Sequence, residues 1–464
     1  MLSSPVIAIL DVGKTNKKLF LFDESYRIVW ESNQVLPEIT DEDGDPCEDL
    51  DSINRWVQEV MADAGKAGKF SIRAINFSAY GASFVHIDRR GNPVTPLYNY
   101  LKPYPEKLKK ELYDQYGGEF NFSMITASPV LGSLNSGMQL YRILKEKPES
   151  FSQITYSLHL PQYLSWLITG KACSDITSIG CHTHLWNFPR NSYHEWVYRE
   201  GIMDKLPTIE SADTIHPANN TESRLKLPSV NPDCVAGTGL HDSSAAIIPY
   251  LEFFTEPFVL ISTGTWCISM NPFNADPLTI AELQNDCLSY ITFRGRPMKA
   301  SRLFAGYEHE QQVVKLAAWF QKDKDAYSRV DFNPETVALL KKKNTGSDLH
   351  FSSAPVSASV FGQRNLSGFE NFEEAYHRLM MDIMEQQVRS TKLIIPRDSV
   401  KKIFVDGGFG RNAVYMQLLA AAFPSIEVFA AKIAQASAIG AAMAIHRHWN
   451  GQPFPKDLIE LRKI

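Results

Sequence analysis

The sequence predicts an α/β fold with two lobes, and three observations lead to this prediction. The chain begins with apolar strands that flank a small polar turn and lead into a helix. A similar succession of strand, small-residue turn and strand returns in the middle of the chain. Strands and helices then alternate towards the C-terminus, with a glycine-rich turn after the first of these strands. The 464 residues are enough for two or three domains.

Three strands and one helix are expected at the start of the chain. Apolar runs at 6–10 and 19–22 flank the polar turn Asp11–Asn16, and residues 27–31 form the third expected strand. A helix is expected from about Asp51, with a stop at Gly65. Its apolar face consists of Ile53, Trp56, Val57, Val60 and Met61. Ribonuclease-H-like lobes begin with three strands followed by a helix.

The middle and the end of the chain predict a second lobe. Strands are expected at 258–262 and 266–270, on either side of the turn Thr263-Gly264-Thr265. A long helix at 372–395 ends before Pro396, and a strand at 402–405 precedes Asp406-Gly407-Gly408-Phe409-Gly410. A helix at 411–423, a strand at 426–430 and a helix at 435–446 complete the pattern. We expect the boundary between 235 and 256, which gives an N-terminal lobe of residues 1–245 and a C-terminal lobe of residues 246–464.

Composition excludes some classes of function. The chain is 44% hydrophobic and 21% charged, with a formal net charge of -5. The chain lacks the excess of positive charge that would indicate binding to nucleic acid or to an anionic membrane. The N-terminal apolar run is too short for a signal peptide, and no segment has the length of a membrane-spanning helix. Six scattered cysteines without CxxC spacing are typical of reduced structural thiols, so we expect a cytoplasmic protein.

The turn Asp11–Asn16 suits phosphate and metal chemistry. A carboxylate at the end of a strand can hold hydrated Mg²⁺, and Gly13 lets the backbone approach an anion. Thr15 and Asn16 can donate hydrogen bonds to phosphate oxygens, and Lys18 adds positive charge. The alternative interpretation is an ordinary β-hairpin turn, where Asp, Gly and Asn are common.

Two further turns have the same small, donor-rich character. Thr263-Gly264-Thr265 lies between two expected strands and, together with the first turn, indicates a two-sided phosphate clamp. Gly407 and Gly408 stand between a strand and a helix, where a ligand can approach the backbone and the first N–H groups of the helix. The alternatives are a simple hairpin turn at the former and tight strand-to-helix packing at the latter.

The segment Gly239-Leu240-His241-Asp242-Ser243 places an acidic residue at the start of an expected helix. Because hydroxyl groups are very weak acids, the expected base in the phosphorylation of a hydroxyl is a carboxylate that accepts the proton as the phosphoryl group transfers. Asp242 is therefore a candidate base. The alternative is a helix N-cap without a functional role.

The segment Cys181-His182-Thr183-His184 has ligand types that zinc accepts. Along 179–186 these residues alternate with apolar ones in the manner of a strand. No second Cys/His pair stands elsewhere in the sequence. We therefore expect no metal at this segment.

Taken in order, these segments resemble the FGGY family of carbohydrate kinases, and most closely its rhamnulokinase and L-fuculokinase-like members. Asp11–Lys18 is similar to the first phosphate loop of the family, with Lys18 in place of an Arg and Lys14 in place of a small hydroxyl residue. Gly239–Ser243 resembles the Gly-x-His-Asp-Thr of rhamnulokinases. Ser262–Trp266 resembles their Ser-Ser-Gly-Thr-Trp, and Asp406–Asn412 the adenosine motif, with Phe409 at a glycine position.

Two further stretches resemble the sugar-binding lobe of the family. Tyr80–Val85 is similar to a segment that contacts the sugar, with Ser83 in place of an acidic residue. Leu160–Gly170 resembles the family's Pro-Asp-Tyr and Leu-Thr-Gly stretch, and Asp175–Asn187 its Thr-rich strand.

The resemblance implies an actin- and hexokinase-type fold, with two lobes around a central cleft that closes on its ligands. It implies Asp242 as the catalytic base, substrate contacts from Gly81, His241, Asp242 and Ser243, and Mg²⁺ held through Asp11 and water. The implied contacts to ATP come from Asp11, Gly13, Lys14, Thr15, Asn16, Lys18, Thr263, Gly264, Thr265, Gly407, Gly408 and Asn412.

The expected activity is ATP-dependent phosphorylation of a 6-deoxyketose such as L-rhamnulose or L-fuculose. A ketopentose such as xylulose or ribulose is the alternative substrate, and a catalytically inactive sugar sensor or an actin-like ATPase is the alternative class. The expected partners are a small sugar and ATP, with neither nucleic acid nor a membrane. The oligomeric state is left open, with a homodimer as one option.

Overall fold

The computed structural model describes residues 4–66, 70–343, 361–396 and 399–464, which form two compact units. Unit 1 comprises Met1–Phe253, Ser289–Pro297 and Ala434–Leu458. Unit 2 comprises Phe254–Leu288, Met298–Ile433 and Ile459–Ile464. A division after residue 245 is the expectation from sequence order. In the structure the chain leaves unit 1 after Phe253, and residues 434–458 belong to unit 1 again. The units are therefore not continuous in the chain.

A seven-stranded mixed sheet forms the centre of unit 1. Its β1 pairs antiparallel with β2 and parallel with β6, and β2 continues into β3 as a second hairpin. The spatial order is β14 (Ile215–Pro217), β15 (Val235–Gly237), β6 (Phe70–Ala79), β1 (Ser4–Val12), β2 (Asn16–Phe22) and β3 (Ile28–Val35), with β16 (Leu240–His241) also pairing with β6. The three predicted N-terminal strands are thereby confirmed.

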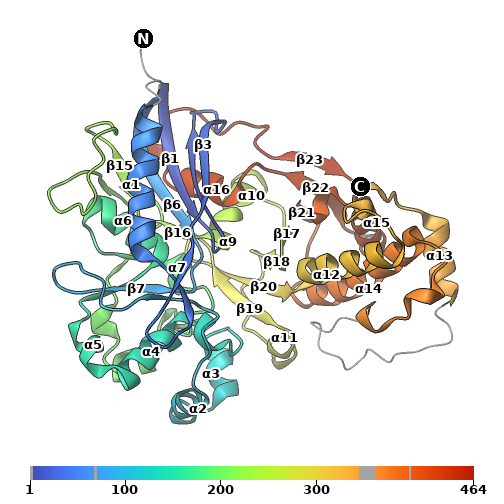
Figure 1. Ribbon diagram of the computed structural model, residues 1–464, viewed down its shortest axis with the longest axis horizontal. Helices are drawn as coiled ribbons and strands as arrows, with labels where there is room; N and C mark the ends of the chain where they lie inside the picture. The colour runs from blue at the N-terminus through green and yellow to red at the C-terminus, as the bar shows by residue number, and fades with distance from the viewer. Residues whose placement is uncertain (1–3, 67–69, 344–360, 397–398) are drawn as a thin grey trace. The chain divides into compact units, whose positions relative to one another are not determined.

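Helices cover both faces of this sheet, because β1 alternates its side chains between two apolar layers. Val6, Ala8, Leu10 and Val12 join the core formed with α1 (Leu50–Lys66) and α6 (Leu160–Thr169). Figure 1 shows α1 running along this sheet. Both β1 and β6 also contact α16 (Ala436–Ala444), which in turn packs on α9 (Asp242–Ala246). The side chain of Asp11 is therefore directed to the α16 layer.

Unit 1 contains a second core, which is largely helical. Its buried residues include Leu112, Tyr141 and Trp196. The helices of this part are α2 (Glu106–Gln115), α3 (Glu119–Ile125), α4 (Ser136–Glu146), α5 (Pro148–Gln153), α7 (Ile176–Ile179) and α8 (Glu195–Arg199), and α10 (Ile248–Phe253) follows α9. Small sheets join β4 (Glu38–Thr40), β5 (Pro46–Glu48) and β8 (Leu97–Tyr98), β7 (Phe84–Ile87) and β9 (Tyr156–His159), β10 (Ser174–Asp175) and β13 (Ile209–Glu210), and β11 (Trp186–Asn187) and β12 (Ser192–Tyr193).

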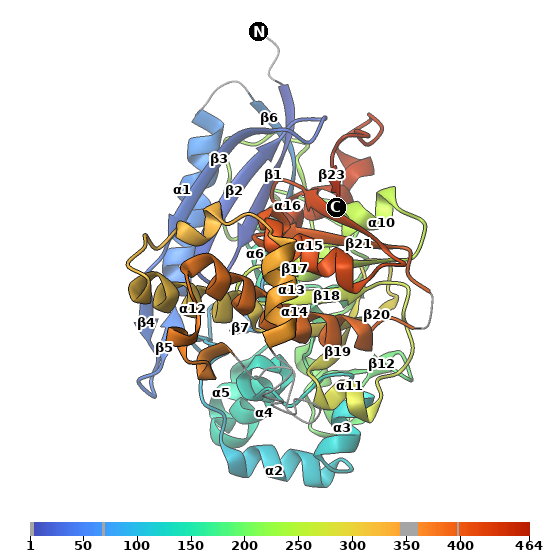
Figure 2. The ribbon, with the colours of Figure 1, turned by 90° about the vertical axis from the view of Figure 1, so that its right-hand side faces the viewer.

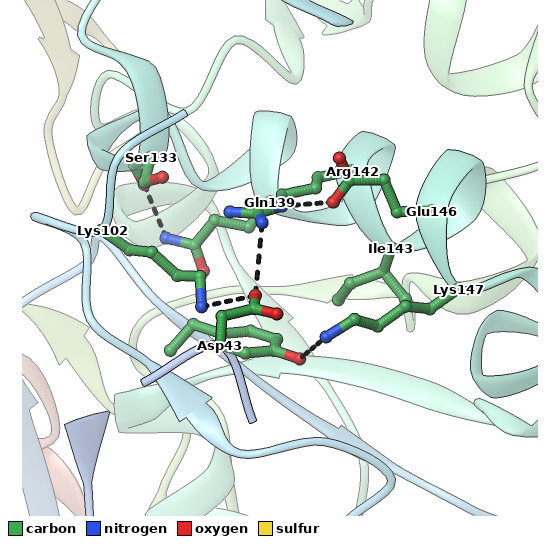
Figure 3. A pocket seen from close by; sticks show the side chains of 9 residues that line it. Asp43, Lys102, Ser133, Gln139, Arg142, Ile143, Glu146 and Lys147 are labelled. Carbon is green, nitrogen blue, oxygen red and sulfur yellow. Dashed lines mark hydrogen bonds and ion pairs between the residues drawn. The ribbon is translucent and has the colours of Figure 1, made fainter. Parts of the chain in front are cut away.

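A buried lysine stabilises the acidic loop between β4 and β5. The Lys102 ammonium contacts the carboxylates of Asp41 and Asp45, the latter at 3.1 Å. Figure 3 shows its contact with Asp43 (2.8 Å), which Arg142 also reaches at 3.3 Å. The side chains of Lys102 and Asp41 are 4% and 0% exposed. Although burial acts in the opposite direction, the hydrogen bond from Lys102 holds the pKa of Asp41 below its ordinary value. The ammonium thus supplies the positive charge that three neighbouring carboxylates need.

We expect Lys102→Met to destabilise unit 1 by about 3–5 kcal/mol, because the buried carboxylate of Asp41 loses the cation with which it pairs. Six of the eight tryptophans lie in unit 1, so tryptophan fluorescence during urea unfolding reports mainly on this unit. The control is Lys110→Met, whose exposed pair with Asp114 is worth about 0–1 kcal/mol. Equal unfolding midpoints for the two variants would contradict this account of the loop.

Unit 2 contains most of a second seven-stranded sheet, of which residues 289–291 and 297 belong to unit 1. Its β17 pairs parallel with β21, and β21 pairs parallel with β22. The order is β19 (Cys287–Ile291), β20 (Pro297–Leu303), β18 (Cys267–Asn271), β17 (Phe258–Thr263), β21 (Lys402–Gly407), β22 (Glu427–Lys432) and β23 (Glu460–Lys463). The helices are α11 (Ile280–Gln284), α12 (Ala305–Trp319), α13 (Pro334–Lys343), α14 (Phe372–Leu393) and α15 (Ala413–Ala422). Helices α12 and α13 pack on α14 (Figures 1 and 2).

Two local predictions are wrong. Gly65 does not end α1, which continues to Lys66; a Cβ at Gly65 would lie 2.0 Å from the Ser229 Cβ, so the glycine serves close packing. Residues 179–186 do not form a strand. Helix α7 ends at Ile179, and His182 and His184 then take left-handed backbone angles, with φ of 41° and 63°. The residues of this irregular segment are buried although they do not form a strand, and this burial accounts for the apolar residues in the sequence pattern.

Candidate active site

Asp11 lies near the carboxyl end of β1, where it is half-buried against α16. Ser437 Oγ donates to its carboxylate at 3.2 Å, and Ser78 is its neighbour across the β1–β6 pairing. Burial raises the pKa of Asp11 to about 6, and the negative charge of Asp242 acts in the same direction. The hydroxyl groups of Ser78 and Ser437 and the charge of Lys18 partly oppose this shift. Two acidic residues far apart in sequence therefore share one electrostatic environment in unit 1.

Asp242 is the first residue of α9, and His241 before it is the N-cap residue. The N–H of Ser243 donates to Asp242 Oδ1 at 2.6 Å, and His241 Nε2 lies 3.1 Å from the same oxygen. The Asp242 side chain is 36% exposed, whereas that of His241 is 5% exposed. Burial lowers the pKa of His241, so a neutral ring stands beside a carboxylate that solvent can reach. The Asp242 side chain makes contacts of its own and is not an N-cap.

Helix α6 fixes the turn that leads to Asp242. The side-chain amide of Gln162 donates to the carbonyl oxygens of Thr238 (3.2 Å) and Gly239 (2.9 Å). Gly239 has a φ of 82°, and a Cβ there would lie 2.8 Å from the carbonyl oxygen of Pro161. The N–H of His241 donates to Thr177 Oγ1 at 3.0 Å. The backbone before Asp242 is therefore held by two helices.

The first polar turn is confirmed as the hairpin between β1 and β2, closed by a hydrogen bond from the Gly13 N–H to the Asn16 carbonyl (2.9 Å). Lys14 is engaged in ion pairs with Glu38 and Glu48. Lys18 donates to Gln435 Oε1 at 3.2 Å, and Thr15 is exposed. Lys14 thus pairs with protein carboxylates, and its expected contact to ATP stays a prediction.

Lys17 is a residue that the sequence analysis missed. Its side chain is 2% exposed, pairs with Glu48 at 2.8 Å and donates to the carbonyl oxygens of Gly13 and Lys14 at 3.2 and 2.9 Å. The lysine thus holds the turn from the inside. The available signal was its position in β2 between Asn16 and Lys18, whose side chains lie on the opposite face of the strand.

In unit 2 the two other predicted turns come together. Thr263 Oγ1 donates to the Asp406 carbonyl at 2.6 Å and accepts from the Phe409 N–H at 3.0 Å. Gly407 has a φ of 90°, and a Cβ there would lie 2.0 Å from the Thr263 carbonyl oxygen. Only glycine fits this position, where the parallel strands β17 and β21 pair at their ends. Tight packing and ligand access are therefore compatible at this place.

These turns border a pocket of about 650 Å³ in unit 2, a size that suits a nucleotide. Its lining includes Thr263, Gly264, Gly408 and Asn412 from the predicted set. Asn412 caps α15 by accepting from the Tyr415 N–H at 2.9 Å and donates to the Tyr376 hydroxyl at 2.6 Å. Phe409 and Arg411 also line the pocket and lie within the segment that resembles the adenosine motif. Sequence reasoning missed the other lining residues, because nothing in the local pattern marks them: Gly306, His309, Tyr327, Ser328, Val330, Asp331 and Ala413.

Two residues of the expected sugar segment are engaged within the protein. Ser83 is buried and donates to the Tyr98 carbonyl at 3.0 Å. A Cβ at Gly81 would lie 2.5 Å from Cys181 Sγ and 3.0 Å from the His241 ring. The space that Gly81 leaves is therefore taken by Cys181 and His241. Gly81 thus allows the position of His241, which is itself an expected sugar contact.

Comparisons with known proteins agree with this geometry. The N-terminal domain model of the FGGY family of carbohydrate kinases matches residues 6–248, and two C-terminal domain models of FGGY carbohydrate kinases match 255–338 and 375–449. A rhamnulokinase from Halalkalibacterium halodurans is 23% identical over 461 residues, which cover 94% of this chain and 90% of that protein.

Solved structures share the fold. A carbohydrate kinase from Novosphingobium aromaticivorans superposes with a TM-score of 0.76 at 24% identity, covering 100% of this chain and 94% of that one. A xylulose kinase from Rhodospirillum rubrum superposes with a TM-score of 0.81 at 15% identity, covering 99% and 94%. The actin- and hexokinase-like α/β fold predicted from the sequence is confirmed. Within the described residues, no helix is long and apolar enough to cross a membrane.

Proposed function

The chain belongs to the FGGY family of carbohydrate kinases and is a sugar kinase, and we propose that it transfers the γ-phosphoryl group of ATP to a hydroxyl of a 6-deoxyketose such as L-rhamnulose or L-fuculose. The observation that carries this proposal is the exposed carboxylate of Asp242 beside the buried neutral ring of His241. A sugar kinase needs a base for the attacking hydroxyl, and this carboxylate is accessible and fixed in direction.

Asp242 would accept the proton of the sugar hydroxyl as that oxygen bonds to the γ-phosphorus and the bond to the leaving ADP oxygen breaks. The Ser243 N–H holds one carboxylate oxygen at 2.6 Å, which leaves the second oxygen to receive the proton. Catalysis of this kind depends mainly on positioning and on electrostatic stabilisation. The rigid support from α6 and α7 meets the first of these needs.

His241 supports the assignment of the sugar class. Because burial lowers its pKa, the ring is neutral and has one N–H donor and one acceptor nitrogen. A neutral imidazole beside the base can distinguish the orientations of sugar hydroxyls. The rhamnulokinase named above matches over most of the chain, which supports the same class.

ATP is expected in the 650 Å³ pocket of unit 2. Gly264 and Gly408 line it, so phosphate oxygens can approach the main chain there, and Arg411 can add positive charge. Thr263 and Gly407 act by holding the two turns against each other. The contacts from Gly13, Asn16 and Lys18 stay predictions.

The residues around Asp11 fit a magnesium ion. A half-buried carboxylate with a raised pKa, close to a second acidic group, is stabilised in its charged form by a nearby cation. Hydroxyl and carboxylate oxygens are the groups that hydrated Mg²⁺ contacts. Asp11 would hold the ion through water, and the ion would offset charge on the phosphates. Asp242 would remain the group that moves the proton.

A ketopentose is the second candidate substrate, because Ser83 replaces an acidic residue of the sugar segment and is engaged with Tyr98. The test is a comparison of kcat/KM for L-rhamnulose, L-fuculose, L-ribulose and D-xylulose in one assay. We expect a deoxyketose to lead. A lead of tenfold or more for a ketopentose, about 1.4 kcal/mol of transition-state discrimination, would overturn the deoxyketose assignment and leave the kinase assignment standing.

A further inference from the structure

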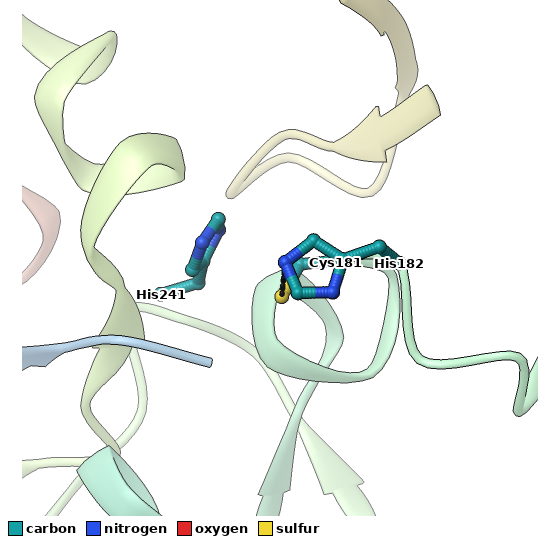
Figure 4. A group of neighbouring side chains, drawn as sticks. All are labelled: Cys181, His182 and His241. Atoms are coloured by element: carbon teal, nitrogen blue, oxygen red, sulfur yellow. Dashed lines mark hydrogen bonds between the residues drawn. The ribbon is translucent and has the colours of Figure 1, made fainter. Parts of the chain in front are cut away.

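A cluster of one thiol and two imidazoles lies beside Asp242 in unit 1. Cys181 and His182 follow α7, and His241 reaches them from the segment before α9 (Figure 4). Ligand atoms of the three side chains lie within 4.8 Å of one another, and Cys181 Sγ is 3.9 Å from His182 Nε2. All three residues are buried. Sequence reasoning expected no metal here because the segment alternates like a strand and no second Cys/His pair stands elsewhere; His241 is 59 positions after His182.

The cluster is held in place by its surroundings. His182 Nδ1 lies 3.1 Å from the Leu134 carbonyl oxygen, to which it donates, so that Nε2 is the ring nitrogen that can bind a metal ion. The backbone of His182 is held in the left-handed region, and its carbonyl accepts from Asn135 Nδ2 at 2.7 Å. Strained backbone at a non-glycine residue is common at ligand sites. Gly81 lacks the side chain that would separate Cys181 from His241.

We propose that Cys181, His182 and His241 form an inhibitory binding site for Zn²⁺ or a similar borderline-soft divalent cation. Thiolate sulfur and imidazole nitrogen are the ligands that zinc prefers, and three protein ligands leave one position open. Mg²⁺ requires oxygen ligands and is not suited to this set. Asp242 lies beside this set of ligands, because its carboxylate is 3.1 Å from His241 Nε2.

Binding requires small shifts and the release of one proton. Zinc bonds of about 2.0 Å to nitrogen and 2.3 Å to sulfur place tetrahedral ligand atoms roughly 3.4 Å apart, so the side chains must approach one another. Cys181 loses its thiol proton to the solvent as the Zn–S bond forms. His241 now contacts Asp242 through Nε2 and Ser244 Oγ through Nδ1 (3.1 Å), and the ion replaces one of these contacts. The Cys181 thiolate and the Asp242 carboxylate together balance the charge of the cation.

Inhibition follows from the position of the cluster. A divalent cation bound to His241 lies beside the Asp242 carboxylate, which is 3.1 Å from His241 Nε2, and competes with the attacking sugar hydroxyl for its oxygens. It also holds His241 away from the sugar. This consequence rests on the proposed function, whereas binding of the ion does not.

The binding test uses the full chain with Co²⁺ as a spectroscopic substitute for Zn²⁺, without sugar or ATP. We expect thiolate-to-cobalt charge-transfer absorption with one ion per chain, which Zn²⁺ abolishes by displacement. Cys181→Ser should remove this absorption and weaken Zn²⁺ binding by about 100-fold or more. Cys173→Ser, at another buried cysteine, should leave both unchanged.

His182→Asn is a second variant that keeps the local fold, because Asn tolerates the left-handed backbone region and can still donate to the Leu134 carbonyl. It should also weaken Zn²⁺ binding. Absence of the charge-transfer band in the wild type, or equal Zn²⁺ affinity in the wild type, Cys181→Ser and His182→Asn proteins, would overturn the site and leave the proposed function untouched.

A kinase assay tests the inhibitory part. With Mg²⁺-ATP in excess, Zn²⁺ should inhibit the wild type, and the half-inhibitory concentration should rise by about 100-fold in Cys181→Ser, in parallel with binding. Saturation of the site by Zn²⁺ without loss of turnover would contradict inhibition and would at the same time argue against Asp242 as the base.

Discussion

Replacement of Asp242 by Asn is expected to lower kcat by about 10³-fold, within the 10²–10⁴ range that a general base contributes. The amide has nearly the same shape, and its oxygen can still accept the Ser243 N–H that the carboxylate accepts at 2.6 Å. It cannot take up the proton of the sugar hydroxyl. Sugar affinity, measured by calorimetry without nucleotide, should therefore stay within about threefold, so the loss appears in kcat rather than in binding.

The matched control for this variant is Asp233→Asn, an equivalent change at an exposed acidic residue of unit 1. We expect its kcat and its sugar affinity to equal those of the wild type. Turnover of Asp242→Asn within tenfold of the wild type would rule out Asp242 as the base.

Replacement of Asp11 by Asn should reduce kcat/KM for Mg²⁺-ATP by about 10²-fold, because a cation near transferring phosphates supplies several kcal/mol of charge stabilisation. Sugar binding should change little. The variant should also be more stable than the wild type at pH 7.5, by up to about 3 kcal/mol. The sign follows from the raised pKa of about 6. The folded state disfavours the charged carboxylate, so the wild type loses stability as pH rises from about 4 to 6. Above pH 6 this loss of stability remains.

Mg²⁺ titrations of turnover and urea unfolding followed by tryptophan fluorescence measure these two effects. Asp63→Asn, at an exposed residue of α1, is the control for both and should resemble the wild type. If the Mg²⁺ titrations of Asp11→Asn and wild type superimpose, the assignment of the ion to Asp11 fails, and an unchanged unfolding midpoint would contradict the raised pKa.

Much of the fold could be predicted because local pattern and tertiary structure agree there. The strands at 6–10, 258–262 and 402–405 lie within β1, β17 and β21, and the helix at 372–395 corresponds to α14. Apolar runs bounded by turns or proline suffice for such elements. The placement of α16 in unit 1 could not be predicted, since its sequence shows an apolar helix and not the sheet that it covers.

The candidate site was predictable where the backbone conformation can be adopted by only one type of residue, glycine. Gly239 and Gly407 have positive φ and close carbonyl neighbours, so glycine at these positions marks special geometry in the sequence itself. The partners of side chains were not predictable. Lys14 pairs with Glu38 and Glu48, and Cys181 meets His241, through contacts between distant segments that no local pattern encodes.

Stoichiometric transfer of phosphate to sugar tests the central claim most directly. The protein is incubated with Mg²⁺, ATP labelled in the γ-phosphoryl group and L-rhamnulose, and the products are separated and counted. The account predicts one labelled sugar phosphate for each ADP, with ADP formation that depends on the sugar. Labelled inorganic phosphate in place of sugar phosphate, formed at the same rate with and without any ketose of the panel, would contradict it.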